Sequence, residues 1–369
     1  MHPILSQAHA TEVHSLCHTL TLYPLDELSV FEARGPEARA FLQGQITNDI
    51  ANAGPEQARL AGYCTAQGRL LATMVVVWAP DSVFGTVPAA AAATGSATST
   101  APGGLPADTG ALLGLLRRDL MAPVLKRLSM FVLRAKAKLN PTTLEVVGVS
   151  LATSQLKALS QQLGHDLPTA AWQAITAPTG LWLCAPSAAS DAVTRWWWLA
   201  ADTQRAACET LKLGFTLKTP EHWQALDVAA GLPWVEAATQ DLLIPQTLNL
   251  DLIEGVSFTK GCYPGQEIVA RSHYRGTVKR RMHFGQVTQA QGLMIQAGSD
   301  IFDALGSEQA CGRVINSTLV AGASAADPSV AHLLFETTFE ALAHNALHLG
   351  GREGAPIRLV ELPYATKPA

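Results

Sequence analysis

The sequence predicts an α+β protein with two or three domains, the last of which is a small all-β module. Its 369 residues exceed the roughly 250–300 residues over which one hydrophobic core usually extends. Residues 28–50 have the pattern of a strand followed by a turn and a helix. After Arg281, short apolar segments alternate with glycines, which is typical of closely spaced turns between strands. These observations set the fold class and place a domain boundary near Gly276.

The N-terminal part is expected to mix strands with helices. In residues 28–50, an apolar run reaches Gly35, and Pro36 suits the first turn of a helix that buries Phe41. In residues 59–78, a Gln-Gly turn separates two strands, the second of which is apolar enough to be buried. A strand, a helix and a hairpin are therefore predicted before residue 80.

The middle of the chain is expected to be more varied. Residues 87–110 are rich in Ala, Gly, Ser, Thr and Pro and hold no aromatic residue, which predicts a mobile, low-complexity surface insertion. A helix is predicted over residues 112–128 and a half-exposed strand over residues 129–139, where apolar and basic side chains alternate. Two further helices are predicted, over residues 154–163 and 205–211. Between them, the three tryptophans at 196–198 predict a buried strand.

The composition excludes several classes of protein. Hydrophobic residues make up 48% and charged residues 15% of the chain, which predicts a globular rather than a disordered protein. A net charge of -4 gives no overall attraction to nucleic acid or to an anionic membrane. The six cysteines are widely separated and show no metal-binding spacing. The N-terminal residues do not have the pattern of a secretory leader, and no stretch of about 18 uninterrupted apolar residues occurs. We therefore expect a cytoplasmic protein with no membrane contact.

The strongest candidate for chemistry is residues 260–267, KGCYPGQE, which we call the cysteine loop. Its two glycines permit backbone angles that other residues avoid, and its proline restrains the tyrosine before it. This combination predicts a shaped turn that presents Cys262. The neighbours expected to shape or assist the turn are Gly261, Tyr263, Gly265, Gln266 and Glu267.

Cys262 is the candidate functional residue of this loop. The ammonium of Lys260, if it faced the sulfur, would lower the pKa of the thiol and so increase the fraction of reactive thiolate. Gln266 and Glu267 add an amide and a carboxylate that can hydrogen-bond a ligand or orient a proton. The alternative is that Cys262 is a small buried hydrophobic residue, which is the common role of an intracellular cysteine.

The cysteine loop and three further segments resemble those of the YgfZ-type folate-binding proteins, a branch of the glycine-cleavage T-protein (aminomethyltransferase) superfamily. The similar segments are FTKGCYPGQEIVARSHYRG at 258–276, AGLP at 230–233, IPQTLNL at 244–250 and FLQGQITND at 41–49. The resemblance implies a GcvT-like ring of three domains around a central cleft. In it, residues 20–275 form a folate-binding region of two α+β lobes, and residues 276–369 form a small C-terminal β-barrel.

The same resemblance implies a function. Proteins of this group bind tetrahydrofolate, support the assembly or repair of iron–sulfur proteins, and are linked to tRNA thiomodification. Their signature cysteine is treated as the functional centre and corresponds to Cys262. For this chain the resemblance therefore implies tetrahydrofolate or a derivative as cofactor, iron–sulfur client or assembly proteins as partners, and tRNA as a further partner.

Three positions depart from the pattern of the T-proteins. Where T-proteins carry an acidic residue after a Gly-rich hairpin, Ala72 lies in a stretch without a carboxylate, which disfavours aminomethyl transfer. Trp182 stands where T-proteins place a glutamate that grips the pterin, so that it either stacks on folate or packs in a strand. Asp227 replaces an arginine common to both branches and weakens the case for folate. With Tyr63, Trp182 and Asp227 are the candidate folate contacts.

A run of basic residues follows the cysteine loop, with no acidic residue between Glu267 and Asp300. We call it the basic stripe, and its members are Arg271, Arg275, Lys279, Arg280 and Arg281. It would attract the glutamyl tail of folate, the acidic face of a partner or an RNA backbone, while a solvated strand pair is an equal alternative.

Three functions follow from these features. The first is a folate-binding accessory factor for iron–sulfur proteins that acts through Cys262 and is linked to tRNA modification. The second is a tetrahydrofolate-dependent aminomethyl or one-carbon transferase. The third is a tRNA- or protein-binding module that uses the basic stripe.

Overall fold

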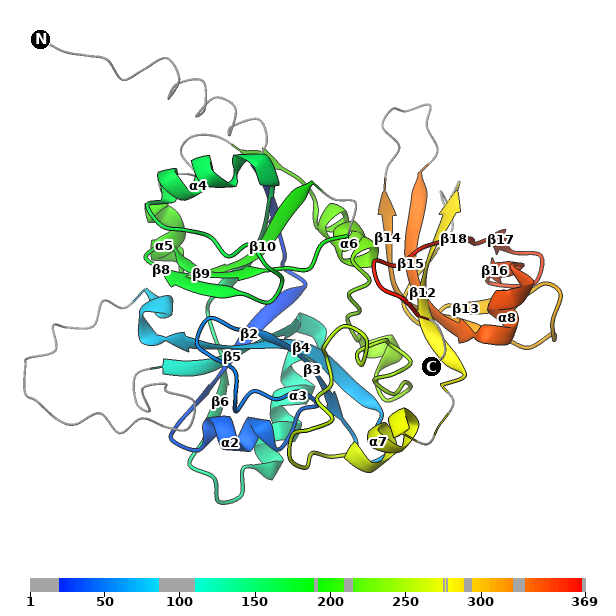
Figure 1. Cartoon of the computed structure of the whole chain (residues 1–369), viewed down its shortest axis with the longest axis horizontal. Coiled ribbons are helices and arrows are strands. Elements are labelled where there is room, and N and C mark those ends of the chain that lie inside the picture. The colour runs from blue at the N-terminus through cyan, green and yellow to red at the C-terminus, as the bar shows by residue number, and fades with distance from the viewer. Residues whose placement is uncertain are drawn as a thin grey trace, which may run out of the picture.

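The computed structural model describes residues 20–85, 110–188, 192–208, 215–274, 276, 278–288, 294–320 and 329–366. The insertion predicted at residues 87–110 lies outside the described residues except for its last position, and Arg275 of the basic stripe lies outside them too. Figure 1 shows three lobes, each built around one β-sheet. The α+β fold predicted from the sequence is confirmed.

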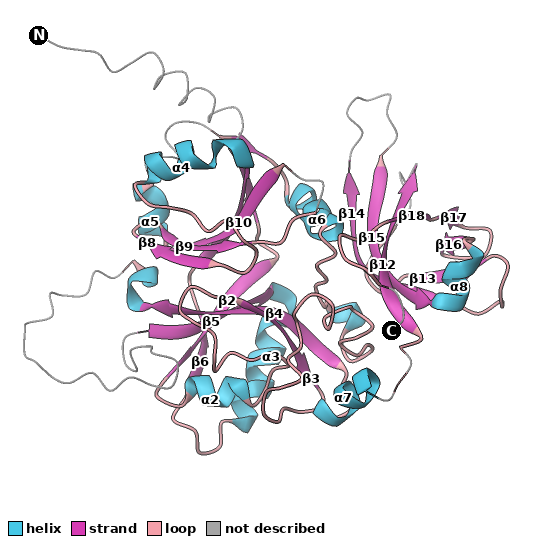
Figure 2. Cartoon of the chain, in the orientation of Figure 1, coloured by secondary structure: helices cyan, strands magenta, loops and turns pink. Residues whose placement is uncertain are grey.

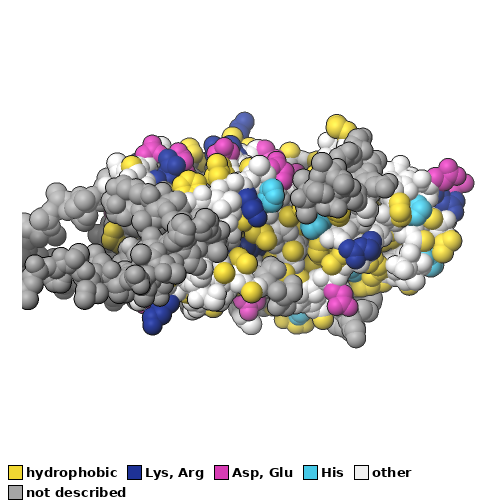
Figure 3. Space-filling view, turned by 90° about the horizontal axis from the view of Figure 1, so that it is seen from above, with side chains coloured by type: hydrophobic (Ala, Val, Ile, Leu, Met, Phe, Trp, Pro, Cys, Tyr) yellow, Lys and Arg dark blue, Asp and Glu magenta, His cyan; other side chains and the backbone are white. Residues whose placement is uncertain are grey.

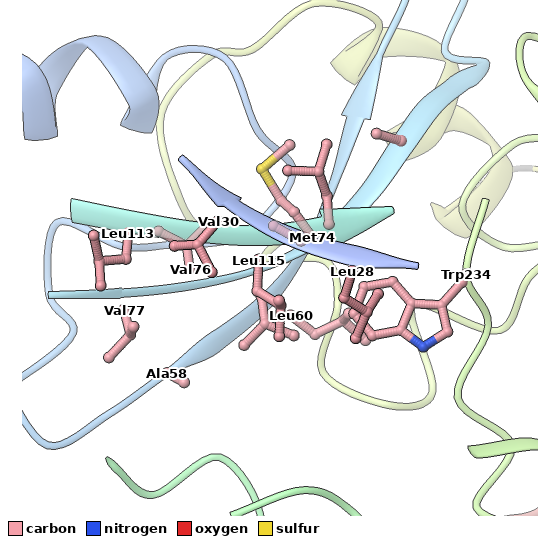
Figure 4. Packing of buried hydrophobic residues seen from close by; sticks show 14 of the residues in the cluster. Leu28, Val30, Ala58, Leu60, Met74, Val76, Val77, Leu113, Leu115 and Trp234 are labelled. Atoms are coloured by element: carbon pink, nitrogen blue, oxygen red, sulfur yellow. The ribbon is translucent and has the colours of Figure 1, made fainter. Parts of the chain in front are cut away.

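The first lobe contains a five-stranded antiparallel sheet. Its strands, in spatial order, are β3 (Arg59–Cys64), β4 (Leu70–Pro80), β5 (Gly110–Arg117), β2 (Leu28–Arg34) and β6 (Lys138–Pro141). The helices of this lobe are α2 (Ala38–Gln43) and α3 (Arg118–Phe131), with a short 3-10 turn η1 (Asp81–Phe84) after β4. Figure 4 shows Leu28, Leu60 and Leu115 gathered in the buried core of this sheet, with Trp234 of a later segment beside them.

The second lobe contains a six-stranded sheet that is antiparallel except for the pairing of its first two strands. In spatial order these are β11 (Thr216–Leu217), β1 (Thr21–Pro24), β7 (Glu145–Ala152), β10 (Val193–Ala200), β9 (Gly180–Cys184) and β8 (Ala174–Ala177). The turn η2 (Thr153–Gln155) leads into α4 (Leu156–Leu163), and α5 (Asp202–Ala207) follows β10. Because side chains alternate along a strand, Trp196 and Trp198 pack beside α4 while Trp197 joins the core shared with the first lobe.

The third lobe is a nearly closed, barrel-like sheet of seven strands. Their order is β17 (Ala355–Pro356), β16 (Leu347–Leu349), β13 (Asp300–Asp303), β14 (Gly312–Val320), β15 (Val330–Thr338), β12 (Arg280–Thr288) and β18 (Arg358–Val360), with α8 (Phe339–His344) between β15 and β16. The two strands at the ends of this order, β17 and β18, are consecutive in the chain, so the sheet curves back toward itself. The small C-terminal β-barrel is confirmed.

Segments between the second and third lobes connect all three. Helix α6 (Pro220–Ala229) packs against β14, and the turn η4 (Ala237–Thr239) and helix α7 (Gln266–Tyr274) follow it in the chain. The backbone of Trp234 exchanges two hydrogen bonds with the side chain of Asn316 in the barrel, at 2.9 and 2.8 Å. Figure 2 shows α6 between the second lobe and strand β14 of the barrel.

Two predicted elements differ from the structure. Residues 112–117 belong to strand β5 rather than to the helix predicted over 112–128, and the helix α3 begins only at Arg118. The strand predicted over 129–139 is likewise divided between the end of α3 and the start of β6. A short apolar run such as residues 112–116 fits a buried strand as well as the first turns of a helix, and here pairing with β2 and β4 on both sides makes it a strand.

No helix in the described ranges is long and apolar enough to cross a membrane.

Candidate functional site at the cysteine loop

The cysteine loop is tied to a segment about two hundred residues earlier in the chain. Thr47 Oγ1 donates a hydrogen bond to the carbonyl of Gly255 at 2.6 Å and accepts one from the backbone N–H of Gly62 at 2.7 Å. Asn48 Nδ2 donates to the carbonyls of Glu254 (2.5 Å) and Leu60 (2.7 Å). Both side chains are buried. The segment FLQGQITND is therefore tied to strand β3 and to the residues that lead into the cysteine loop.

Lys260 anchors the loop itself. Its side chain is buried, and Nζ donates to the backbone carbonyls of Gln43, Ile46 (2.5 Å) and Asn48 (3.1 Å). Burial lowers the pKa of Lys260 to about 8. The hydrogen bonds of the ammonium are thus directed at main-chain oxygens rather than at the sulfur of Cys262, so the geometry gives Lys260 a positioning role.

The two glycines of the loop are not equivalent. Gly265 has a φ of +81°, and a Cβ added there would lie 2.4 Å from the carbonyl oxygen of Thr65 and 2.5 Å from Cα of Gly68 in the β3–β4 turn. Only glycine allows this backbone angle together with this close approach. Gly261, by contrast, has no positive φ, and a Cβ there would meet nothing within 4 Å. The conformational role expected for Gly261 is therefore wrong.

Cys262 is exposed at the surface. It is the one exposed cysteine within the described ranges, because Cys64, Cys184 and Cys208 are buried and Cys311 is half-buried. Burial raises the pKa of Cys64 and of Cys184 to about 12, which keeps both as unreactive thiols. The interpretation of Cys262 as a buried hydrophobic residue does not hold, and an accessible thiol on an anchored loop remains.

The remaining residues of the loop frame this thiol. Tyr263 is buried, and the ammonium of Lys260 lies 5.2 Å from the centre of its ring. Burial raises the pKa of the Tyr263 hydroxyl above its usual range. Gln266 is half-buried and Glu267 is exposed on the first turn of α7. The amide and the carboxylate thus lie at the end of the loop that faces solvent.

Helix α7 was not predicted from the sequence. It buries Val269, whose carbonyl accepts a hydrogen bond from Gln246 Nε2 at 2.7 Å. The signal was present, because Glu267 in the first turn and Arg271 in the last turn suit the helix dipole. The helix brings the third similar segment, IPQTLNL, to the cysteine loop.

The basic stripe is not one solvent-facing patch. Arg281 is buried and makes a bidentate ion pair with Asp251, at 2.6 and 2.9 Å. Arg280 pairs with Glu336 on the adjacent strand, at 2.6 and 3.0 Å. Of the described members, Arg271 and Lys279 are exposed. The sequence shows no acidic residue within the run, but carboxylates from other elements pair with two of its four described members.

The three candidate folate contacts lie in different surroundings. Tyr63 is buried on β3 in the core shared by the first two lobes, and burial raises the pKa of its hydroxyl. Trp182 belongs to the separate cluster beside α4, where it stacks on Trp198 with ring centres 5.1 Å apart and donates to Thr179 Oγ1. Packing in a strand, the alternative interpretation for Trp182, matches these contacts. The structure does not bring these residues into one open site.

Asp227 lies on α6 and its charge is compensated internally. Its carboxylate accepts hydrogen bonds from Arg195 (2.5 Å) and from the indole of Trp234 (2.9 Å), and all three side chains are buried. Burial raises the pKa of Asp227 above its usual range despite these two donors. Sequence reasoning treated Asp227 as a reversed charge near a cleft and missed Arg195, which lies 32 residues earlier on β10.

A small cavity lies at the junction between the first lobe, α6 with the segment after it, and the barrel. Asp227, Glu236, Arg117 and Asn316 contribute its polar lining, together with Gln224 and Trp234. Its volume is about 20 Å³, which is room for about one water molecule. Folate, with its pterin and benzoyl-glutamate groups, does not fit this cavity with the lobes in the present arrangement.

Comparisons with known proteins define the class and then the family. No family model matches the chain. In fold the chain is similar to the glycine cleavage system aminomethyltransferase T from Bartonella henselae, with a TM-score of 0.59 and 14% identity over 96% of this chain and 89% of that one. The chain therefore shares its overall fold with that aminomethyltransferase.

Sequence relatives are more specific. The tRNA-modifying protein YgfZ of Klebsiella pneumoniae (strain 342) is 30% identical over 265 residues, covering 71% of this chain and 70% of the relative. The protein of the same name from Escherichia coli (strain SMS-3-5 / SECEC) is 28% identical over 284 residues, covering 76% of each chain. The chain belongs to the YgfZ family.

Proposed function

We propose that this chain is an accessory factor that supports the assembly or repair of iron–sulfur proteins through the thiolate of Cys262. The observation that carries the proposal is the exposed thiol on a loop fixed on both sides. Lys260 holds the loop before the cysteine, and Gly265 packs against the β3–β4 turn after it. A partner can reach such a thiol without the loop having to unfold.

The chemistry of a thiolate suits this role. Thiolates are the soft ligands that iron–sulfur clusters prefer, and they are also the nucleophilic form of cysteine. The described residues hold no group of three or more His, Cys, Asp or Glu side chains that would bind a metal ion. Cys262 would therefore act together with ligands of a client protein rather than within a metal site of this chain.

Complementation tests the proposal. In a bacterium that lacks its own YgfZ protein, we expect the wild-type chain to restore the activity of iron–sulfur enzymes and Cys262→Ala to fail. Cys311→Ala is the matched control, because Cys311 is half-buried and far from the loop in sequence. Full restoration by Cys262→Ala would remove the thiol from the mechanism.

Aminomethyl transfer is the less favoured function. Ala72, at the position where T-proteins carry a carboxylate, is fully buried on β4 and pairs with Tyr63 on β3. An alanine cannot take up a proton or stabilise charge on the reacting nitrogen of a folate. The proposal is therefore an accessory factor rather than a transferase.

Binding of tetrahydrofolate or a derivative is a separate part of the proposal, and it is supported by the family. Since the junction cavity holds about one water molecule, binding there would require the lobes to separate, and the role of Cys262 proposed above includes no folate step. Calorimetric titration of the purified chain with tetrahydrofolate tests this part. We expect measurable heat of binding, and its absence would remove folate without affecting the thiol.

A link to tRNA modification completes the proposal, because the relatives are named tRNA-modifying proteins. We propose that the accessory role extends to a tRNA-modifying pathway that depends on iron–sulfur enzymes. Measuring the modified nucleosides of total tRNA in the complemented strain tests this link. Unchanged nucleoside content in the strain without the protein would contradict it.

A further inference from the structure

A second cluster of basic residues in the first lobe comes from a segment outside the cysteine loop. We call it the α3–β6 tip, residues 126–138, where the end of α3 leads into the edge strand β6 at the lower edge of the molecule in Figure 1. It carries five exposed cations, Lys126, Arg127, Arg134, Lys136 and Lys138. No acidic residue occurs between Asp119 and Glu145.

Two polar groups lie beside these cations: the Glu37 carboxylate accepts a hydrogen bond from the backbone N–H of Lys136, and Arg127 interacts with the hydroxyl of the buried Tyr63. Among the ion pairs between described residues, none involves a member of the tip. The tip thus concentrates positive charge in a chain whose net charge is -4. On the face seen in Figure 3, by contrast, basic and acidic side chains are interspersed among the described residues. The uneven distribution favours an anionic partner at the tip.

The tip also exposes apolar side chains. Met130 is 67%, Phe131 is 46% and Leu133 is 84% exposed. The guanidinium of Arg127 lies 6.0 Å from the centre of the Phe131 ring, so that a cation and an aromatic face are presented side by side. Unpaired nucleotides offer the matching chemistry, because their phosphates attract cations and their bases stack on aromatic rings.

We propose that the α3–β6 tip binds unpaired regions of RNA, such as the loops of a tRNA. Its cations contact phosphates, Phe131 stacks on a splayed base, and Met130 and Leu133 pack at the edge of that base. The inference rests on the RNA link in the proposed function and gives it a surface. The proposed RNA contact lies at the tip rather than at the basic stripe, because Arg280 and Arg281 of the stripe already pair with carboxylates.

The residue types favour RNA over a protein partner. Three of the five cations are lysines, and lysine is depleted at the centres of protein interfaces. Lysine suits phosphate contacts, which need charge rather than fixed geometry. A membrane with anionic lipids would also attract cations beside apolar side chains, so the experiment includes a vesicle arm.

Fluorescence anisotropy of the full chain with a labelled, unmodified tRNA transcript tests the proposal, over about 50 to 200 mM salt. In the variant Lys126→Gln/Arg134→Gln/Lys136→Gln we expect an affinity loss of about tenfold or more and a shallower salt dependence, because phosphate contacts release fewer counterions. The matched control is Lys157→Gln/Lys218→Gln/Arg352→Gln, which likewise changes two lysines and one arginine, all exposed and outside both the tip and the basic stripe, and it should bind like the wild type.

Phe131→Ala separates stacking from charge. We expect it to lower the affinity roughly five- to tenfold while the salt dependence stays unchanged, since the stacking of a base on an aromatic ring carries no charge. A fully paired RNA duplex should be insensitive to this change. The substituted side chains are exposed, so we expect each variant to fold, and circular dichroism checks this.

Three results would overturn the proposal. The first is wild-type affinity in the tip variant, and the second is an equal loss in the control variant. The third is tip-dependent binding to vesicles of phosphatidylcholine and phosphatidylglycerol without binding to tRNA, which would make the tip a membrane contact. None of these results depends on the Cys262→Ala complementation. The failure of RNA binding at the tip can therefore be distinguished from the failure of the thiol mechanism.

Discussion

Single residues of the cysteine loop carry distinct physical tasks. Cys262 is exposed, while its neighbours Lys260 and Tyr263 are buried. Gly265 combines a positive φ with a close approach to the β3–β4 turn, whereas Gly261 meets neither condition. The pattern Gly-Cys-Tyr-Pro-Gly therefore contains one glycine that the backbone requires and one that it does not.

Gly265→Ala and Gly261→Ala form a matched pair that tests this difference. We expect Gly265→Ala to lower the free energy of unfolding by about 2–4 kcal/mol, from backbone strain and from overlap with Thr65 and Gly68. Gly261→Ala should change it by less than about 0.5 kcal/mol, since the added methyl group meets open space. Urea denaturation of both variants measures the difference, and similar losses would contradict the close packing of Gly265.

Elements far apart in the chain are joined around the loop by buried polar contacts. The turn after α2 supplies carbonyls that hold Lys260, and its Thr47 and Asn48 hold the turn at Glu254 and Gly255 before the loop. The side chain of Gln246 donates a hydrogen bond to the carbonyl of Val269 and so holds α7, which follows the loop. The loop is therefore positioned by contacts with residues far away in the sequence, which no local pattern specifies. The contribution of its anchor, Lys260, can be measured.

Lys260→Met removes the anchor and keeps the apolar stem. We expect a loss of about 2–4 kcal/mol in the free energy of unfolding, because three backbone carbonyls lose a charged donor. Lys279→Met is the control, since Lys279 is exposed, and should be close to neutral. Limited proteolysis should also cut the cysteine loop faster in Lys260→Met. Equal stability of the two variants would show that the carbonyl contacts contribute little.

The whole molecule is held together by buried charges as well as by its core. Arg195 and Asp227 pair between the second lobe and α6, and Arg281 and Asp251 pair where the barrel begins. Arg281 has a further consequence for His283, which is buried two residues later on β12. Burial, together with the Arg281 charge, lowers the pKa of His283 to about 4.

The shifted pKa of His283 predicts how stability depends on pH. Between about pH 6.5 and pH 4 the unfolded chain binds a proton at this histidine and the folded chain does not, so stability falls as the pH falls. From pH 7 to pH 5 we expect His283 to account for a loss on the order of 2 kcal/mol. His283→Gln should show a smaller loss over the same interval in urea denaturation. Parallel pH curves for the two proteins would contradict the prediction.

Much of the fold and the position of the candidate functional loop follow from the sequence alone. Strands β2 and β4, the tryptophan strand β10 and the all-β C-terminal lobe were predicted because alternation, apolar runs and turn residues are local signals. The residue types of the cysteine loop and its similarity to one family identify it as the candidate site. These features depend on neighbours within a few positions.

The tertiary structure decided the partners of the charged groups. Lys260 points into carbonyls rather than at Cys262, Asp227 is paired by Arg195, and the basic stripe is partly neutralised by Asp251 and Glu336. Each partner lies between 30 and more than 200 residues away, and β5 became a strand only through pairing on both sides. Buried charges must find partners wherever the fold provides them, and sequence spacing does not record that choice.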